Sequence, residues 1–198
     1  MNPWDQRYDR DDFFYGVEPN DFLVAQAPRL KPGSAVLCLA EGEGRNACYL
    51  AGLGHQVTAI DSSLVGLTKL DRLAENRGLR VETVCADLAD CELEPRGWDA
   101  IVAIWCHLPV PLRQQVHRQS VAALRPGGLF ILEAYAPEQL QFGTGGPPTR
   151  DLLMALPTVQ QELAGLDWRV AQALEREVQE GTGHHGRSAV IQLVGQRP

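Results

Sequence analysis

One glycine-bearing segment, residues 36–51, limits what this chain can fold into more than any other stretch. It reads VLCLAEGEGRNACYLA, an apolar run followed by Gly42 and Gly44 and then by a helix-like pattern. Glycines allow a sharp turn after a strand, and the first turn of the following helix offers unpaired N–H groups. Such turns occur in α/β domains that bind nucleotide-like ligands. The segment therefore predicts a strand–turn–helix unit beside a ligand site.

Strand-like and helix-like segments alternate after this turn, and the end of the chain breaks the alternation. Apolar runs predict strands over 34–40, 56–60, 81–86, 98–105 and 129–135, with helices over 20–30, 45–53, 63–77 and 111–124. Residues 168–178 and 187–195 read as two strands joined only by the turn GTGHHG. The pattern predicts an α/β fold, a Rossmann-like, doubly wound, mostly parallel seven-stranded sheet with a C-terminal antiparallel hairpin.

Length and composition predict one globular domain over residues 1–198. We divide it into a lead-in segment (1–30), a ligand-binding core (34–135) and a substrate-side loop, helix and hairpin (136–198).

The net charge of −7 and the lack of a basic stretch argue against a nucleic-acid partner. No apolar run reaches the length of a membrane span, and no signal peptide is visible. The five cysteines show no CxxC spacing and indicate reduced thiols, so we expect a cytoplasmic protein without a metal site. The sequence does not indicate an oligomeric state.

The residues at the carboxyl ends of the predicted strands are the candidates for the site, because open parallel sheets bind ligands there. The first strand delivers Glu41 between Ala40 and the glycines, and the second delivers Asp61. A carboxylate at the second position can accept two hydrogen bonds from the vicinal hydroxyls of a ribose. The alternative for Asp61 is an N-cap of the next helix, and for the glycines a tight turn without a ligand.

The third and fourth strands add two further candidates. Asp87, next to Leu88, can accept a hydrogen bond from an exocyclic adenine amine, or be a solvated loop acid. His107 follows Cys106 at the end of the fourth strand and can orient or deprotonate a nucleophile. A structural histidine is the competing interpretation. His184 and His185, in the hairpin turn, are expected to be exposed, although a place at the substrate mouth stays open.

The order of these features resembles that of class I S-adenosylmethionine-dependent methyltransferases. It comprises the glycine turn, an acid ending the second strand, Ala86-Asp87-Leu88, Trp98-Asp99, LRPGG before the fifth strand, and a terminal hairpin. The lead-in, WDQRY followed by YGVEPNDFL, is similar to that of small bacterial methyltransferases of the tellurite-resistance and thiopurine types. The resemblance covers residues 34–195 and implies S-adenosyl-L-methionine as cofactor.

The resemblance also implies a role for each matching residue. The cofactor would be held by Ala40, Glu41, Gly42 and Gly44 at its methionine part, by Asp61 and Ser62 at the ribose, and by Asp87 and Leu88 at the adenine. Cys106 and His107 would face the methyl group, with His107 as the candidate catalytic base. Trp4, Arg7, Tyr8 and Tyr15 would form a lid over the substrate. The chain departs from the family where Cys38 replaces an acid and Ala40 a glycine, and Glu41 is the residue that could compensate.

Methyl transfer to a small acceptor, such as a thiol, a chalcogen oxyanion or another soft nucleophile, is the function that the sequence favours. The changed motif around Cys38 motivates an alternative, a cofactor-binding module without catalysis. The spacing GxGxxA together with Asp61 motivates another, a nicotinamide-dependent oxidoreductase.

Overall fold

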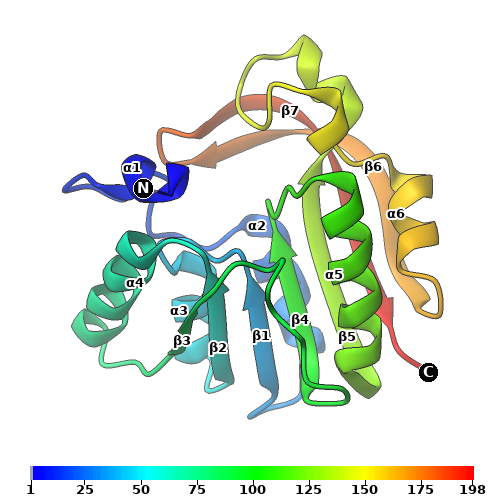
Figure 1. Ribbon diagram of the computed structural model, residues 1–198, viewed down its shortest axis with the longest axis horizontal. Helices are drawn as coiled ribbons and strands as arrows, with labels where there is room; N and C mark the ends of the chain where they lie inside the picture. The colour runs from blue at the N-terminus through cyan, green and yellow to red at the C-terminus, as the bar shows by residue number, and fades with distance from the viewer. Residues whose placement is uncertain (1) are drawn as a thin grey trace.

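A seven-stranded sheet forms the centre of the protein, and the computed structural model describes it over residues 2–198. The strands are β1 (Ala35–Leu39), β2 (Gln56–Asp61), β3 (Glu82–Cys85), β4 (Trp98–Ile104), β5 (Leu124–Tyr135), β6 (Asp167–Glu180) and β7 (His184–Gln196). They lie in the order β3-β2-β1-β4-β5-β7-β6 (Figure 1). The first five are parallel, and β7 pairs antiparallel with both β5 and β6. This confirms the predicted mostly parallel sheet with its C-terminal hairpin.

Helices cover both faces of the sheet, as an apolar parallel sheet requires. One buried cluster joins α2 (Asp21–Gln26), α3 (Arg45–Gly52) and α4 (Leu64–Asn76) to one face. A second joins α5 (Val110–Ala123) and α6 (Leu156–Glu162) to the other. Each α/β unit thus has its apolar stripe against the strands, which leaves the strand ends for the site.

Two boundaries differ from the sequence-based expectation. β5 begins at Leu124, because the Arg125–Gly128 segment bulges out of the β4–β5 ladder without ending it. The hairpin strands are also longer than expected, and only residues 181–183 form the turn. His184 therefore belongs to a strand and is buried, with 6% of its surface exposed. The expectation that His184 is exposed was wrong, whereas His185 is exposed.

Three segments gather at the carboxyl-end edge of the parallel strands. They are α1 (Pro3–Tyr8), the short 3₁₀ helices η2 (Pro137–Gln141) and η3 (Arg150–Leu152), and the end of the β6–β7 hairpin. A further 3₁₀ turn, η1 (Ala27–Arg29), follows α2. Figure 1 shows the hairpin reaching across this edge toward α1. The N-terminal segment and the β6–β7 hairpin thereby enclose the place where an open α/β sheet binds its ligand.

Within residues 2–198, every helix is too short or too polar to cross a lipid bilayer.

Candidate active site

A cavity of about 450 Å³ lies at the carboxyl ends of β1, β2 and β4, beneath the lead-in segment and the hairpin. Of the residues predicted for the site, twelve line it: Trp4, Arg7, Tyr8, Tyr15, Ala40, Glu41, Asp61, Ser62, Asp87, Leu88, Cys106 and His107. Gly42 and Gly44 do not. The cavity has the size of ligand sites in enzymes, and its lining mixes apolar surface with a few carboxylates.

The glycine turn is shaped by packing around it. A Cβ on Gly42 would lie 2.6 Å from the Tyr8 hydroxyl, and one on Gly44 would lie 2.2 Å from the Leu70 side chain. Both glycines have positive φ. We expected them to admit a ligand, but the space beside their Cα atoms is filled by α1 and α4. Ala40, which does line the cavity, has a φ of +49°, a region that glycine adopts more easily.

Two carboxylates hold this turn in place. Glu41 accepts hydrogen bonds from the backbone N–H groups of Asn46 (3.0 Å) and Ala47 (2.8 Å) at the start of α3. Asp61 accepts from the N–H of Gly42 (2.8 Å) and, with its other oxygen, from that of Ser63 (2.8 Å). Burial raises the pKa of both groups, that of Glu41 to about 7. Glu41 thus anchors the loop in a chain that has Cys38 at the usual acidic position.

The N-cap of α4 is Ser63, whose hydroxyl accepts from the N–H of Gly66. Asp61 therefore keeps acceptor capacity on both oxygens for a ligand.

Residues 2–20, the first part of the lead-in segment, are held over the cavity by buried contacts. Lys69 on α4 donates to the carbonyl oxygens of Tyr8 (3.2 Å), Arg10 (3.1 Å) and Asp12 (2.6 Å), and it pairs with Glu43 at 2.5 Å. Asn2 donates to Ser62, and Asp5 accepts from Ser63. Lys69 is only 6% exposed, so its buried ammonium group holds the backbone of this segment against α4. These contacts place Trp4, Arg7, Tyr8 and Tyr15 on the cavity wall.

His107 is bonded through both ring nitrogens to the backbone. Nδ1 lies 2.8 Å from the carbonyl oxygen of Leu152, and Nε2 accepts from the N–H of Tyr135 at 3.2 Å. Burial lowers the pKa of His107 to about 4. With one nitrogen donating and the other accepting, neither is free to take a proton from a substrate. The prediction that His107 is a general base is therefore not supported by this geometry. The geometry fits the alternative, in which His107 is a structural histidine.

Cys106 is buried, and burial raises its pKa to about 12. It therefore contributes a neutral thiol to the wall. Among residues 2–198, no group of three or more histidines, cysteines or carboxylates is arranged to hold a metal ion.

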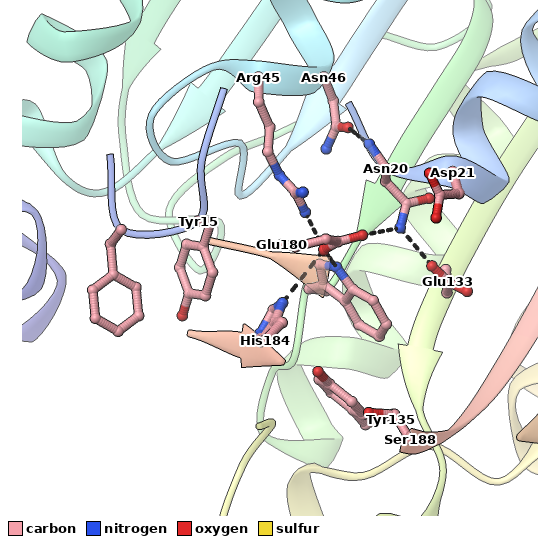
Figure 2. Close-up of polar contacts among 12 residues, drawn as sticks. Tyr15, Asn20, Asp21, Arg45, Asn46, Glu133, Tyr135, Glu180, His184 and Ser188 are labelled. Atoms are coloured by element: carbon pink, nitrogen blue, oxygen red, sulfur yellow. Dashed lines mark hydrogen bonds and ion pairs between the residues drawn. The ribbon is translucent and has the colours of Figure 1, made fainter. Parts of the chain in front are cut away.

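A buried charged cluster backs the cavity on the hairpin side, and sequence reasoning missed it (Figure 2). Glu180 on β6 accepts from Arg45 (2.5 Å), from the indole N–H of Trp105 (2.5 Å) and from Asn20 (2.7 Å). His184 Nδ1 lies 3.5 Å from the same carboxylate. Hydrogen bonds and charges from His184 and Arg45 hold the pKa of Glu180 well below its usual range.

The cluster continues into the sheet through a second carboxylate. Glu133 on β5 is fully buried and accepts from Arg176 (2.8 Å), Gln192 (2.7 Å) and Asn20 (2.5 Å). Asn20 thereby bridges the two glutamates. The only sequence signal for this cluster was the presence of charged residues at inward positions of the hairpin strands, which periodicity alone does not connect to Arg45.

Aromatic rings line the cavity next to this cluster. The Trp105 and Tyr135 rings are stacked, with their centroids 4.4 Å apart. The centroid of the His184 ring lies 5.0 Å from that of Trp105 and 4.6 Å from that of Tyr15. Trp105 has a φ of +58°, which is rare for a bulky side chain. Strained backbone of this kind persists where surrounding contacts fix it, often at functional sites. At Trp105 the contacts are the stack with Tyr135 and the hydrogen bond to Glu180.

Comparison with known proteins agrees with this geometry. Residues 36–128 match the family described as methyltransferase domain. The uncharacterized methyltransferase YbaJ of Bacillus subtilis (strain 168) is 30% identical over 113 residues, which are 57% of this chain and 44% of YbaJ. The chain thus matches less than half the length of this curated relative.

Solved structures extend the likeness to about nine-tenths of the chain. TehB from Haemophilus influenzae superposes with a TM-score of 0.75 at 18% identity, over 90% of this chain and 62% of TehB. An S-adenosylmethionine-dependent methyltransferase from Methanosarcina mazei gives 0.70 at 15% identity, over 91% and 99%. The chain has the same α/β fold as these structures. The family match over residues 36–128 and these neighbours imply S-adenosylmethionine as the cofactor.

Proposed function

We propose that this protein transfers the methyl group of S-adenosylmethionine to a small-molecule acceptor. The observation that supports this most directly is the single cavity of about 450 Å³ in which the predicted cofactor residues, the lead-in segment and the aromatic wall meet. A donor and an acceptor held in one enclosed space can be aligned in line, and alignment supplies a large share of the rate in such reactions.

The residues around the cavity fit the cofactor. Bound S-adenosylmethionine supplies an activated methyl group on a sulfonium. Asp61 retains acceptor capacity for ribose hydroxyls, and Glu41 offers negative charge where the cationic methionine amine is expected. Asp87 is exposed at the cavity mouth and Leu88 buried beside it, as a site for adenine requires. These assignments rest on the family resemblance and on the cavity lining.

The acceptor side of the cavity favours a compact ligand. Phe14, Tyr15, Trp105 and the prolines at 147 and 148 line it, and Arg45 is already paired with Glu180. A thiol or another soft nucleophile fits such an apolar wall, since these nucleophiles need little solvation to react. Among residues 2–198, Arg7 and Arg45 are the arginines on the cavity wall.

Calorimetry with S-adenosylmethionine, S-adenosylhomocysteine and NAD tests the proposal. We expect both sulfur ligands to bind and NAD not to bind. Asp61→Asn, which preserves the shape of the side chain, should weaken both sulfur ligands about tenfold or more. Asp99→Asn is the control, because Asp99 lies at the other end of the sheet and bonds to Ala35 and Arg125. Binding of NAD alone would contradict the proposal and support the oxidoreductase alternative. Cofactor binding without methylation across a panel of acceptors would support the inactive module.

A further inference from the structure

Two histidines line the cavity, and they differ in what their ring nitrogens contact. Both nitrogens of His107 are bonded to the backbone. His184 has one hydrogen bond in the described residues, from Nδ1 to Glu180. Figure 2 shows this nitrogen facing Glu180 and the other nitrogen facing away from it, on the side of Tyr15. Because the Glu180 carboxylate can only accept, Nδ1 carries the proton and Nε2 keeps a free lone pair.

We propose that His184, oriented by Glu180, is the catalytic base of this cavity, and that the acceptor is a neutral, ring-bearing molecule whose reacting oxygen, nitrogen or sulfur carries a proton. The inference rests on the proposed function. It gives a role to the hairpin, which lies outside residues 36–128 that match the methyltransferase domain. A histidine held by a carboxylate in one tautomer is a recurrent arrangement for proton transfer.

Glu180 is well placed to hold this tautomer. It is cross-strand partner to His184 in the β6–β7 ladder, so the backbone fixes their separation. Arg45, Trp105 and Asn20 anchor its two oxygens, which prevents the carboxylate from rotating away. Glu180 does not itself line the cavity, and it acts as a positioning residue through His184.

Burial, more than the local charges, lowers the pKa of His184 and so favours the neutral ring. Burial lowers the pKa of His184, and Arg45 and Arg7 lower it further, while Glu180 raises it. The groups that face its ring from the surrounding elements are Arg7 on α1, Tyr15 in the lead-in, Arg45 on α3, His107 after β4, Tyr135 on β5 and Glu180 on β6.

The proposed step balances without a further reactant. The acceptor heteroatom attacks the methyl carbon while His184 Nε2 takes the proton from that heteroatom. The carbon–sulfur bond breaks, and its electron pair stays on sulfur, which becomes the neutral thioether of S-adenosylhomocysteine. The imidazolium then returns its proton to solvent. General-base assistance of this kind contributes about 10²–10⁴-fold.

The surroundings of His184 define the class of acceptor. Its ring contacts Tyr15 and Trp105, and Phe14 also lines the cavity. Aromatic walls favour offset or edge-to-face contact with a ring in the ligand. Arg45 is paired with Glu180. Arg7, the other arginine on the cavity wall, lies over the Trp4 and Phe14 rings. The surface beside the His184 ring is therefore mainly aromatic. Phenols and N–H heterocycles have this chemistry, whereas an acceptor that arrives ionised, as most aromatic thiols do near neutral pH, needs no base.

Nitrogen-15 spectra of the histidine rings test the pairing without any acceptor. The chain has five histidines, and His184→Asn identifies the signal of His184. We expect the neutral tautomer with the proton on Nδ1. In Glu180→Gln, the protonation midpoint should fall, because the carboxylate that raises it is gone. A proton on Nε2 in the wild-type protein would overturn the proposal, as would a midpoint that Glu180→Gln leaves unchanged.

Turnover with a panel of phenols and N–H heterocycles tests the catalytic role. His184→Asn keeps a donor for Glu180 but lacks Nε2. We expect it to bind S-adenosylmethionine within about threefold of wild type and to lose about 100-fold or more in turnover. In wild type, turnover should fall at acidic pH as the His184 ring becomes protonated. The variant should lack this acidic limb of the pH–rate profile, because it has no ring to protonate. His107→Asn is the matched control, and it should keep that limb even if its melting temperature falls.

The two proposals fail in different ways. If neither sulfur ligand binds the wild-type protein, the proposed function fails, and the ring spectra still report on the Glu180–His184 pair. If both bind but His184→Asn methylates as fast as wild type, the base assignment alone is wrong. If no acceptor in the panel is methylated, the assigned acceptor class is wrong, and the spectra decide whether the pair exists.

Discussion

The two walls of the cavity are built on different physical principles. The wall from the parallel strands uses short, local contacts: Glu41 bonds to residues five and six positions later, and Asp61 to one two positions later. The hairpin wall uses charges brought together from distant parts of the chain, such as Arg45 with Glu180. The contacts of the parallel-strand wall hold the backbone of the glycine turn in place. Those of the hairpin wall fix the orientation of side chains on the cavity surface, such as Trp105 and His184.

This difference has an energetic consequence. Buried ion pairs recover little net free energy after desolvation, so the hairpin cluster is weak evidence for extra stability. Removing one partner, however, leaves an uncompensated charge in the interior. The hairpin wall should therefore be much more sensitive to single substitutions than the parallel-strand wall.

The largest effect is expected at Glu133, the fully buried carboxylate of the hairpin cluster. Glu133→Leu leaves Arg176 without its main partner, and we expect a loss of about 3–5 kcal/mol in the free energy of unfolding. Urea unfolding followed by circular dichroism measures this. The double variant Glu133→Leu/Arg176→Leu removes both charges and should regain a large part of the loss. If Glu133→Leu alone cost less than about 1 kcal/mol, the cluster would be too hydrated to fix side-chain directions.

The same contrast explains what the sequence could predict. Apolar runs and glycine turns are local signals, and they identified the strands of the parallel half and twelve residues of the cavity lining. The hydrogen bonds of the His107 ring depend on η3 and β5. Those of Glu180 depend on Asn20 and Arg45, which lie more than 100 residues earlier in the chain. No periodicity in the chain encodes such pairings. The position of His184 was missed because the hairpin turn is shorter than its glycines suggested.

A smaller effect, dependent on pH, is expected at Glu41. Its pKa is raised to about 7 in the folded protein, from an ordinary value near 4.5. The folded state therefore binds more protons than the unfolded state between these values, and this group destabilises the fold as pH rises through that range. Glu41→Gln should match wild type near pH 4 and exceed it by about 3 kcal/mol at pH 8.

Glu162 on α6 provides the opposite case for comparison. Its pKa is lowered to about 2 by His117 and Arg113, although burial alone would raise it. Its contribution is present above its ordinary pKa and is lost as pH falls toward 2. Glu162→Gln should therefore destabilise the protein near neutral pH and have little effect in acid. Thermal melts of both variants from pH 2 to 8 compare the two signs, because the Glu162 effect changes below about pH 4.5 and the Glu41 effect above it. A constant difference between Glu41→Gln and wild type from pH 4 to 8 would show that the pKa of Glu41 is not raised in the fold.

The smallest effect is expected at Ala40, the strained residue of the parallel-strand wall. A left-handed alanine costs about 1 kcal/mol, which glycine avoids, but glycine adds about 0.5–1 kcal/mol of chain entropy to the unfolded state. Ala40→Gly should thus change the free energy of unfolding by less than about 0.5 kcal/mol. Ala51 is a matched control, since it is similarly half-buried but lies inside α3 and has no positive φ. Ala51→Gly has no strain to relieve and should destabilise the protein by about 0.5–1 kcal/mol. Equal losses at both positions, measured by urea unfolding, would mean that the turn holds Ala40 without strain. In that case the departure from the family's glycine would carry no energetic penalty, and the difference between the two walls would lie in their charges alone.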